Sequence, residues 1–178
     1  MNLVERVKAI LLSPKTEWQA IEGEPGDANY LFTNYVAILA AVPAVAAFLG
    51  YSIAGLGIGR ALFLAIFLYV VYCAAWYVEA LVIDGLAPTF GGQKNFPNAL
   101  KVAAYSSTAG LLAGIFQLIP LISVLSILGL YSLYLLWLGL PVLMKSPPDR
   151  ATGYTAAVVV IMFVIMIIIG FIVGMVIF

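Results

Sequence analysis

Long apolar runs, separated by short polar segments, dominate the hydrophobic pattern of this chain. Each run is long enough to cross a bilayer as a helix, because about 20 apolar residues span roughly 30 Å of hydrocarbon. The pattern therefore predicts an all-α polytopic membrane protein, a bundle of five transmembrane helices. The predicted spans are Tyr30–Ile53, Ala61–Ile83, Ala99–Ile119, Leu121–Leu143 and Tyr154–Phe178.

Residues 1–29, ahead of the first span, show a shorter, amphipathic pattern. Ser13 followed by Pro14 is typical of a helix start, because serine caps a helix and proline suits its first position. The short helix that follows carries Trp18 and Ile21 on one side. An earlier helix is predicted from apolar residues at helical spacing, namely Leu3, Val4, Val7, Ile10 and Leu11. We therefore divide the chain into an amphipathic cytoplasmic segment, 1–29, and a transmembrane domain, 30–178.

Two interpretations of this N-terminal segment stay open. In the first, Trp18 and Ile21 belong to a surface that recruits a soluble partner. In the second, the two short helices lie against the lipid headgroups or cap the bundle at its cytoplasmic end. Amphipathic periodicity is compatible with both, since it shows only that one face of each helix is apolar.

The third and fourth spans are predicted to form a tight hairpin. Residues 102–144 carry no charged side chain, and a single helix over them would be about twice as long as a bilayer is thick. Gln117 and Pro120 lie near the middle of this stretch, and an interior proline breaks the helical hydrogen bonding. We expect the chain to turn there, on the outer side, although a re-entrant segment is an alternative.

The basic residues are distributed unevenly between the two sides that five spans define. All but one of the eight Lys and Arg residues fall in the N-terminal segment or near the loops after the second and fourth spans. Under the positive-inside rule these segments are cytoplasmic. We therefore expect a cytoplasmic N-terminus and an external C-terminus. The basic residues on the inner side are Arg6, Lys8, Lys15, Lys94, Lys101, Lys145 and Arg150, and Arg60 lies on the outer side.

Composition narrows the classes of function. The chain is 65% hydrophobic and 9% charged, with no net charge, so it has no basic field for nucleic acid. It contains no histidine, which removes Ser-His-Asp and Cys-His pairs and HExxH zinc sites. The single cysteine, Cys73, lies inside the second span and is expected to be a small buried apolar residue. We expect no catalytic residues, no metal site and no cofactor.

Polar side chains inside the second and third spans are the main candidates for a functional site. Helical spacing places a carboxylate, Glu79, on one face of the second span, and Lys101 opens a polar face of the third. Because an unpaired charge in hydrocarbon is costly, we predict that these two residues pair, directly or through water. The pair either fixes the packing of the two spans or serves a proton, an ion or a ligand. The other members of the predicted polar cluster are Tyr72, Trp76, Tyr105, Ser106, Ser107 and Thr108.

Glycine pairs at GxxxG spacing occur in two spans. Gly110 and Gly114 in the third span are expected to make contacts within the bundle. Gly170 and Gly174 lie in the fifth span, which has no polar residue after Thr155. That span is therefore predicted to face lipid or a second copy of the chain, with a possible homo-oligomer through the two glycines.

Several short motifs together resemble the bacterial branch of the Yip1 family, small five-span membrane proteins with a cytoplasmic N-terminus. The stretches on which this resemblance rests are Leu12-Ser13-Pro14-x-x-x-Trp18, Phe90-Gly91-Gly92, Ala104-Tyr105-Ser106-Ser107, and Tyr131-x-x-Tyr134 ahead of Lys145 and Pro147. The proline that often follows the family's Tyr-Ser motif is absent, since Thr108-Ala109-Gly110 stands there. The long cytoplasmic domain of eukaryotic members, which bind small GTPases, is also missing. The resemblance implies an inner-membrane location and leaves the activity open.

Two classes of function fit these features. The first is a non-enzymatic Yip1-like protein that organises lipid or other membrane proteins at the cytoplasmic face. The second is a small transporter or channel subunit, with Glu79 and Lys101 at the inner mouth of a path lined by Tyr72, Trp76 and other members of the polar cluster. A water-accessible cavity that reaches these residues would favour the second class, and a closed core the first.

Overall fold

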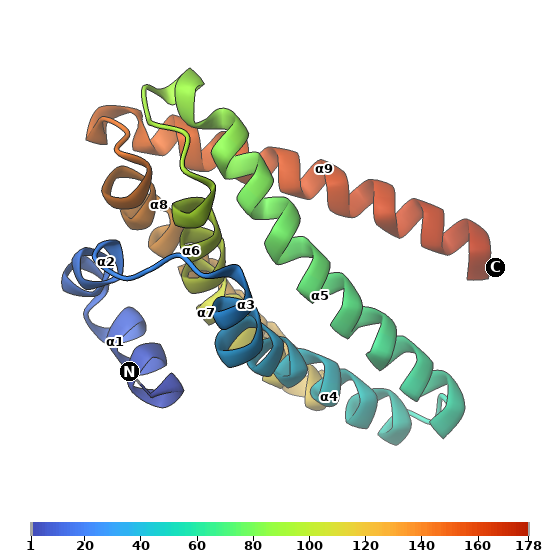
Figure 1. Cartoon of the computed structure of the whole chain (residues 1–178). Helices are drawn as coiled ribbons and strands as arrows, with labels where there is room; N and C mark the ends of the chain where they lie inside the picture. The colour runs from blue at the N-terminus through green and yellow to red at the C-terminus, as the bar shows by residue number, and fades with distance from the viewer. Residues whose placement is uncertain (1, 178) are drawn as a thin grey trace.

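The computed structural model describes residues 2–177, and it describes the surroundings of their side chains except at 120, 121, 123 and 172–177. This part of the chain is mostly helical, with five helices long and apolar enough to cross a membrane (Figure 1). The prediction of an all-α protein with five such spans is confirmed. The observed spans are Ala28–Ile53, Ile58–Phe90, Phe96–Leu118, Val124–Met144 and Pro148–Phe171.

The helices follow one another with short connections. The N-terminal pair is α1 (Leu3–Leu12) and α2 (Pro14–Glu22), and the first span consists of α3 (Ala28–Leu31), a π-helical turn η1 (Phe32–Val36) and α4 (Ala37–Ile53). The second span is α5 (Ile58–Leu86) with the 3-10 turn η2 (Ala87–Phe90). The remaining elements are α6 (Phe96–Ser106), α7 (Thr108–Ala113), η3 (Gly114–Leu118), η4 (Pro120–Leu130), α8 (Tyr131–Met144), η5 (Pro148–Arg150) and α9 (Ala151–Ile177).

Side-chain caps define the starts of the short helices near the N-terminus. The Asn2 side chain accepts a hydrogen bond from the Val4 amide at the start of α1. Pro14 occupies the first turn of α2, as the sequence predicts. The Asp27 carboxylate accepts hydrogen bonds from the amides of Asn29 and Tyr30 and so starts the first span. These caps satisfy amides that have no partner inside the helix.

The predicted hairpin between the third and fourth spans is present. α7 tightens into the 3-10 turn η3, Ile119 is extended at φ −125° and ψ 111°, and η4 begins at Pro120. The helical hydrogen bonding is therefore interrupted where the proline predicts it. In contrast to the regular helix expected for the start of the fourth span, η4 is a 3-10 helix along its 11 residues.

Glycines bring the hairpin close to its neighbours. A Cβ atom on Gly114 would lie 2.4 Å from the Cβ of Pro43 in α4, and one on Gly129 would lie 3.2 Å from the Cα of Gly110. The prediction that Gly110 and Gly114 make contacts within the bundle is confirmed. Gly170 has open space beside it, and Gly174 lies outside the residues whose surroundings are described. The predicted homo-oligomer through these two residues stays a prediction.

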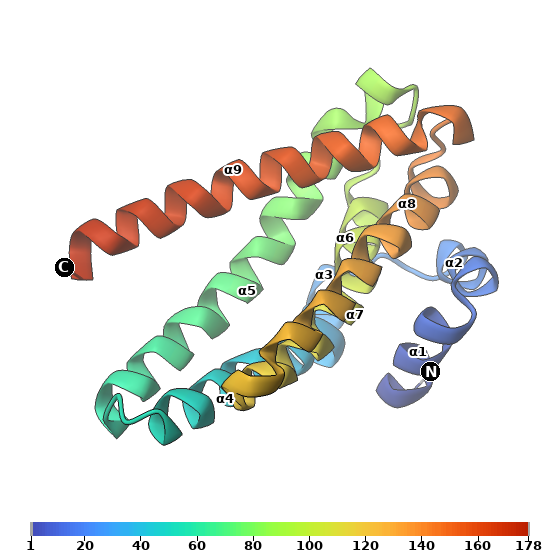
Figure 2. The ribbon, with the colours of Figure 1, turned by 180° about the vertical axis from the view of Figure 1, so that it is seen from behind.

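α6 is the central helix of the bundle, because each of its residues from Ala99 to Ser106 is buried. α5 and α8 pack on it, and α9 packs on α5 and α8. Figures 1 and 2 show α9 crossing the bundle near its own start and leaving it toward the C-terminus. The α5–α6 and α8–α9 connections meet at one end, where the Gln93 amide donates to the Met144 carbonyl at 2.8 Å. α2 lies beside the same end of α8. We call this the loop end.

Candidate functional site

A buried lysine of α6 holds the N-terminal helix pair against the bundle. Lys101 is 2% exposed, and its ammonium donates to the carbonyl oxygens of Ile21 at 2.9 Å, Glu22 at 3.3 Å and Glu24 at 2.9 Å. The last carbonyls of a helix have no partner within the helix and carry its partial negative charge. Lys101 therefore caps the C-terminus of α2 and the segment that follows.

This arrangement corrects the prediction of a direct pair between Glu79 and Lys101. In the described part of the chain, the salt bridges join Arg6 to Glu17, Arg6 to Glu24 and Lys145 to Glu22, and neither predicted partner takes part. The physical reason is that backbone carbonyls of α2 satisfy the Lys101 ammonium. Sequence periodicity shows on which face of a helix a charge lies. It does not show that the C-terminus of another helix will lie against that charge.

Arg6 of α1 makes the second link within the same assembly. Its guanidinium is hydrogen-bonded to the carboxylates of Glu17 and Glu24, and it lies 5.3 Å from the ring centre of Tyr105. Burial of the guanidinium opposes its charge, but the hydrogen bond to Glu24 and the nearby negative groups outweigh this effect, so the pKa of Arg6 is raised. A raised pKa means that the stabilisation is fully present below the ordinary arginine pKa and is lost only above it. Arg6 is thus a permanent cation at this site.

Trp18 and Ile21 are core residues, which corrects the hypothesis that they form a surface for a partner. Both side chains are 0% exposed. The Trp18 ring packs on Gly139 of α8, where an added Cβ would lie 2.7 Å from a ring carbon, and it meets Tyr105 edge-on at 6.3 Å between ring centres. The helix pair caps the bundle as in the second interpretation, because Gly139 leaves room for the indole.

The outward face of the helix pair combines apolar and basic side chains. Leu12 is 80% exposed and Val4 55% exposed. Lys8 and Lys15 are exposed on the same two helices. The surface that a partner can reach is thus formed by residues other than Trp18 and Ile21.

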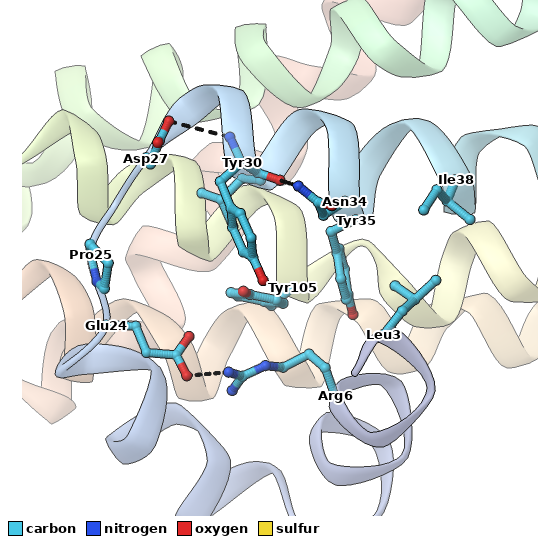
Figure 3. A pocket seen from close by; sticks show the side chains of 11 residues that line it. Leu3, Arg6, Glu24, Pro25, Asp27, Tyr30, Asn34, Tyr35, Ile38 and Tyr105 are labelled. Carbon is cyan, nitrogen blue, oxygen red and sulfur yellow. Dashed lines mark hydrogen bonds and ion pairs between the residues drawn. The ribbon is translucent and has the colours of Figure 1, made fainter. Parts of the chain in front are cut away.

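A cavity of about 530 Å³ lies where α1, the segment after α2, the first span and α6 meet (Figure 3). Figure 3 shows the rings of Tyr30 and Tyr105 near its centre, with Arg6 and Glu24 joined below them. Tyr35 donates to the Thr108 hydroxyl at 2.7 Å, since that hydroxyl itself donates to the Tyr105 carbonyl. The lining residues are Leu3, Arg6, Glu24, Pro25, Asp27, Tyr30, Leu31, Asn34, Tyr35, Ile38 and Tyr105.

The π-helical turn η1 shapes this cavity. Turns of this kind insert an extra residue into a helix and are often found at functional sites. Asn34 and Tyr35 lie within η1, and both line the cavity. The Asn34 side chain donates to the Tyr30 carbonyl at 3.1 Å. Sequence periodicity alone gives no signal of this turn.

A second cavity, of about 450 Å³, lies between α5, α6, α7, α8 and α9. Four of the eight members of the predicted polar cluster line it, namely Tyr72, Glu79, Ser106 and Ser107. Trp76, in contrast, donates to the Leu100 carbonyl at 3.1 Å, and its ring stacks on Phe32 of the first span. α6 therefore divides the predicted cluster into two sites, and no single path lined by all its members is formed within the described residues.

Several residues of these sites had little or no signal in the sequence. No motif in the sequence includes Glu17, Glu24 or Gly139. The two carboxylates nevertheless accept hydrogen bonds from Arg6, and the glycine leaves room for the Trp18 ring. The Arg6–Glu17 pair joins two helices, which a single-helix spacing rule does not detect. Among the described residues, no group of three His, Cys, Asp or Glu residues lies close enough to hold a metal ion.

The comparisons with known proteins agree with this architecture. The Yip1 domain family matches residues 8–169. Among curated proteins, the inner membrane protein YohC from Escherichia coli K12 and that from Escherichia coli O6:H1 are each 27% identical to the chain over 128 residues. The match covers 66% of this chain and 66% of each relative's length, so the chain spans just under two thirds of these curated relatives. No solved structure matches the chain. The match over residues 8–169 shows that this chain belongs to the Yip1 family of membrane proteins.

Proposed function

We propose that this protein is a non-enzymatic component of the inner membrane that organises lipid or protein partners at the cytoplasmic face. The observation that carries the proposal is the fixed position of α1 and α2. Lys101 and Arg6 attach this helix pair to the bundle, while Leu12 and Val4 remain exposed. A rigid amphipathic surface loses little conformational entropy when a partner binds.

The chemistry of this surface indicates what it contacts. Exposed Leu12 and Val4 beside Lys8 and Lys15 suit the boundary between anionic headgroups and acyl chains, or an apolar patch on a protein with acidic neighbours. The concentration of basic residues at the loop end supports a cytoplasmic position for it, with the C-terminus outside. The similarity to inner membrane proteins of E. coli supports an inner-membrane location.

A second candidate function is a small transporter or channel subunit. The observation in its favour is Glu79, a carboxylate that lines the cavity between α5 and α9. Lys101 would take no part in such a path, because its ammonium faces the carbonyls of α2. Flux through liposomes that depends on Glu79 would favour this candidate over the organising function.

The organising function is tested by photo-crosslinking in native membranes. A photoreactive residue at Leu12 is compared with the same residue at Ile53, which is 75% exposed at the opposite end of the first span. The proposal predicts a protein or headgroup adduct from position 12 that is absent from position 53 and that is lost in Lys101→Met, where the helix pair is released. Identical adducts from both positions, or no effect of Lys101→Met, would overturn it.

A further inference from the structure

The cavity between α5 and α9 has a polar end and an apolar end. Glu79, Ser106 and Ser107 lie at the polar end, and none of them is close to a basic side chain in the described residues. Glu79 itself makes no hydrogen bond or ion pair with another described residue. The apolar end is formed largely by α8 and α9, with Leu133, Leu136, Val159, Met162, Phe163 and Met166.

The cavity opens toward the outside of the bundle, where lipid would lie. Phe163 is 66% exposed and Met166 37% exposed, although both also line the cavity. Figures 1 and 2 show α9 diverging from α5 in this direction. A molecule in the membrane can therefore reach Glu79 from the side.

The depths of Glu79 and of the α9 methionines match the layout of a phospholipid. Glu79 lies seven residues before the end of α5 at Leu86, which is about 10 Å along the helix axis from the loop end. Met162 and Met166 lie farther along α9 from its start at Ala151. Glu79 is therefore closer to the headgroup region than Met162 and Met166, which lie toward the membrane centre.

The hydrogen-bonding groups at the polar end are mostly acceptors. Ser107 donates its hydroxyl to the Ala104 carbonyl at 3.0 Å, and Ser106 donates to the Ala103 carbonyl at 3.5 Å. Their oxygen lone pairs remain available, as do both oxygens of the Glu79 carboxylate. A primary ammonium has three N–H donors and a positive charge, so it complements this set in both charge and hydrogen bonding.

We propose that this groove binds a membrane phospholipid with a primary-ammonium headgroup, which Glu79 holds while an acyl chain lies along α9. An anionic headgroup would place like charges together, and a quaternary ammonium would have no N–H to donate. The proposal goes beyond the organising function, because it uses none of the residues of the α1–α2 surface. Failure of one therefore leaves the other standing.

The test is native mass spectrometry of the full chain released from detergent micelles. The detergent contains phosphatidylethanolamine, phosphatidylglycerol or phosphatidylcholine with identical acyl chains. We expect the wild-type protein to retain phosphatidylethanolamine preferentially, and Glu79→Gln to weaken this retention by about tenfold, since a charge-assisted contact is lost. Binding of the other two lipids should not change.

Two further variants separate the headgroup contact from general effects. Ala75→Leu places a larger apolar side chain in the groove without changing charge, and it should also reduce phosphatidylethanolamine retention. Glu5→Gln removes an exposed carboxylate on α1 and should leave retention unchanged. Equal retention by wild type and Glu79→Gln, equal retention of all three lipids by wild type, or an equal loss in Glu5→Gln would overturn the proposal. A monodisperse elution profile confirms that each variant is folded.

Discussion

Lys101 and Glu79 lie in neighbouring helices that pack together, yet the surroundings of the two side chains differ. Lys101 is 2% exposed and donates to three backbone carbonyls. Glu79 lines a cavity and makes no contact with a charged or hydrogen-bonding partner among the described residues. The surroundings of a charged residue in the membrane, rather than its presence alone, therefore distinguish a structural group from a candidate binding group.

The energetic reason is the cost of removing a charge from water. A buried charge is tolerated when several hydrogen bonds replace its hydration, and truncating it then leaves its partners unsatisfied. An ionisable residue without such partners destabilises the fold, so its removal costs nothing structurally. The two residues should therefore respond to substitution with opposite signs.

The largest effect is expected for Lys101→Met. Loss of the ammonium removes its hydrogen bonds to the carbonyls of Ile21 and Glu24, and the Ile21 carbonyl is left with the Glu24 amide at 3.2 Å, so the free energy of unfolding should fall by about 3 kcal/mol. Hydrogen exchange of α1 and α2 should rise, because the helix pair is released. The control is Lys94→Met, on the exposed loop before α6. Unchanged exchange in Lys101→Met would contradict the assigned role.

Gly139→Ala should have the next largest effect. The new Cβ would lie 2.7 Å from a ring carbon of Trp18, so either the indole or α8 must move. Overpacking of this kind costs about 2 kcal/mol, and the change should appear as lower thermal stability in detergent. Gly85→Ala is the matched control, because that glycine has open space beside it. A similar loss of stability in both variants would show that the Trp18 contact is unimportant.

Arg6→Lys should destabilise the helix pair by about 1 kcal/mol, since an ammonium poorly reproduces the two separate guanidinium contacts to Glu17 and Glu24. The reverse exchange at an exposed position, Lys8→Arg, serves as the control. Protease protection of α1 in detergent measures both variants. Because the pKa of Arg6 is raised, its contribution should stay constant from neutral pH up to the ordinary arginine pKa. Full protection in Arg6→Lys would argue that charge alone is sufficient.

Glu79→Gln should change stability least, and in the opposite direction. In detergent without lipid we expect the free energy of unfolding to stay within about 1 kcal/mol of wild type or to rise, because the variant removes an unpartnered charge. Thermal unfolding monitored by circular dichroism is the measurement. A destabilisation as large as that of Lys101→Met would show that Glu79 has a structural partner, and the contrast between the two residues would fail.

The sequence by itself determined the all-α architecture and the five spans, because the length of an apolar run and the bilayer thickness leave few alternatives. It also located the hairpin, since the backbone of Pro120 cannot continue a helix. The first-turn proline of α2, Pro14, is a local feature that the sequence predicted, whereas the predicted cap residue Ser13 makes no side-chain hydrogen bond to the helix. These properties depend on neighbouring residues and on the solvent.

Which charged residues have partners depends on the tertiary structure. The sequence indicated that Lys101 and Glu79 are exceptional, but the spacing suggested a pair between them, whereas α2 brings its terminal carbonyls to Lys101. The sequence also left open whether Trp18 contacts a partner or belongs to a cap on the bundle, and the absence of a side chain at Gly139 allows the indole to be buried. Both outcomes depend on contacts between segments far apart in the chain. Periodicity describes one helix at a time, and it carries no information about which other helix will lie beside each face.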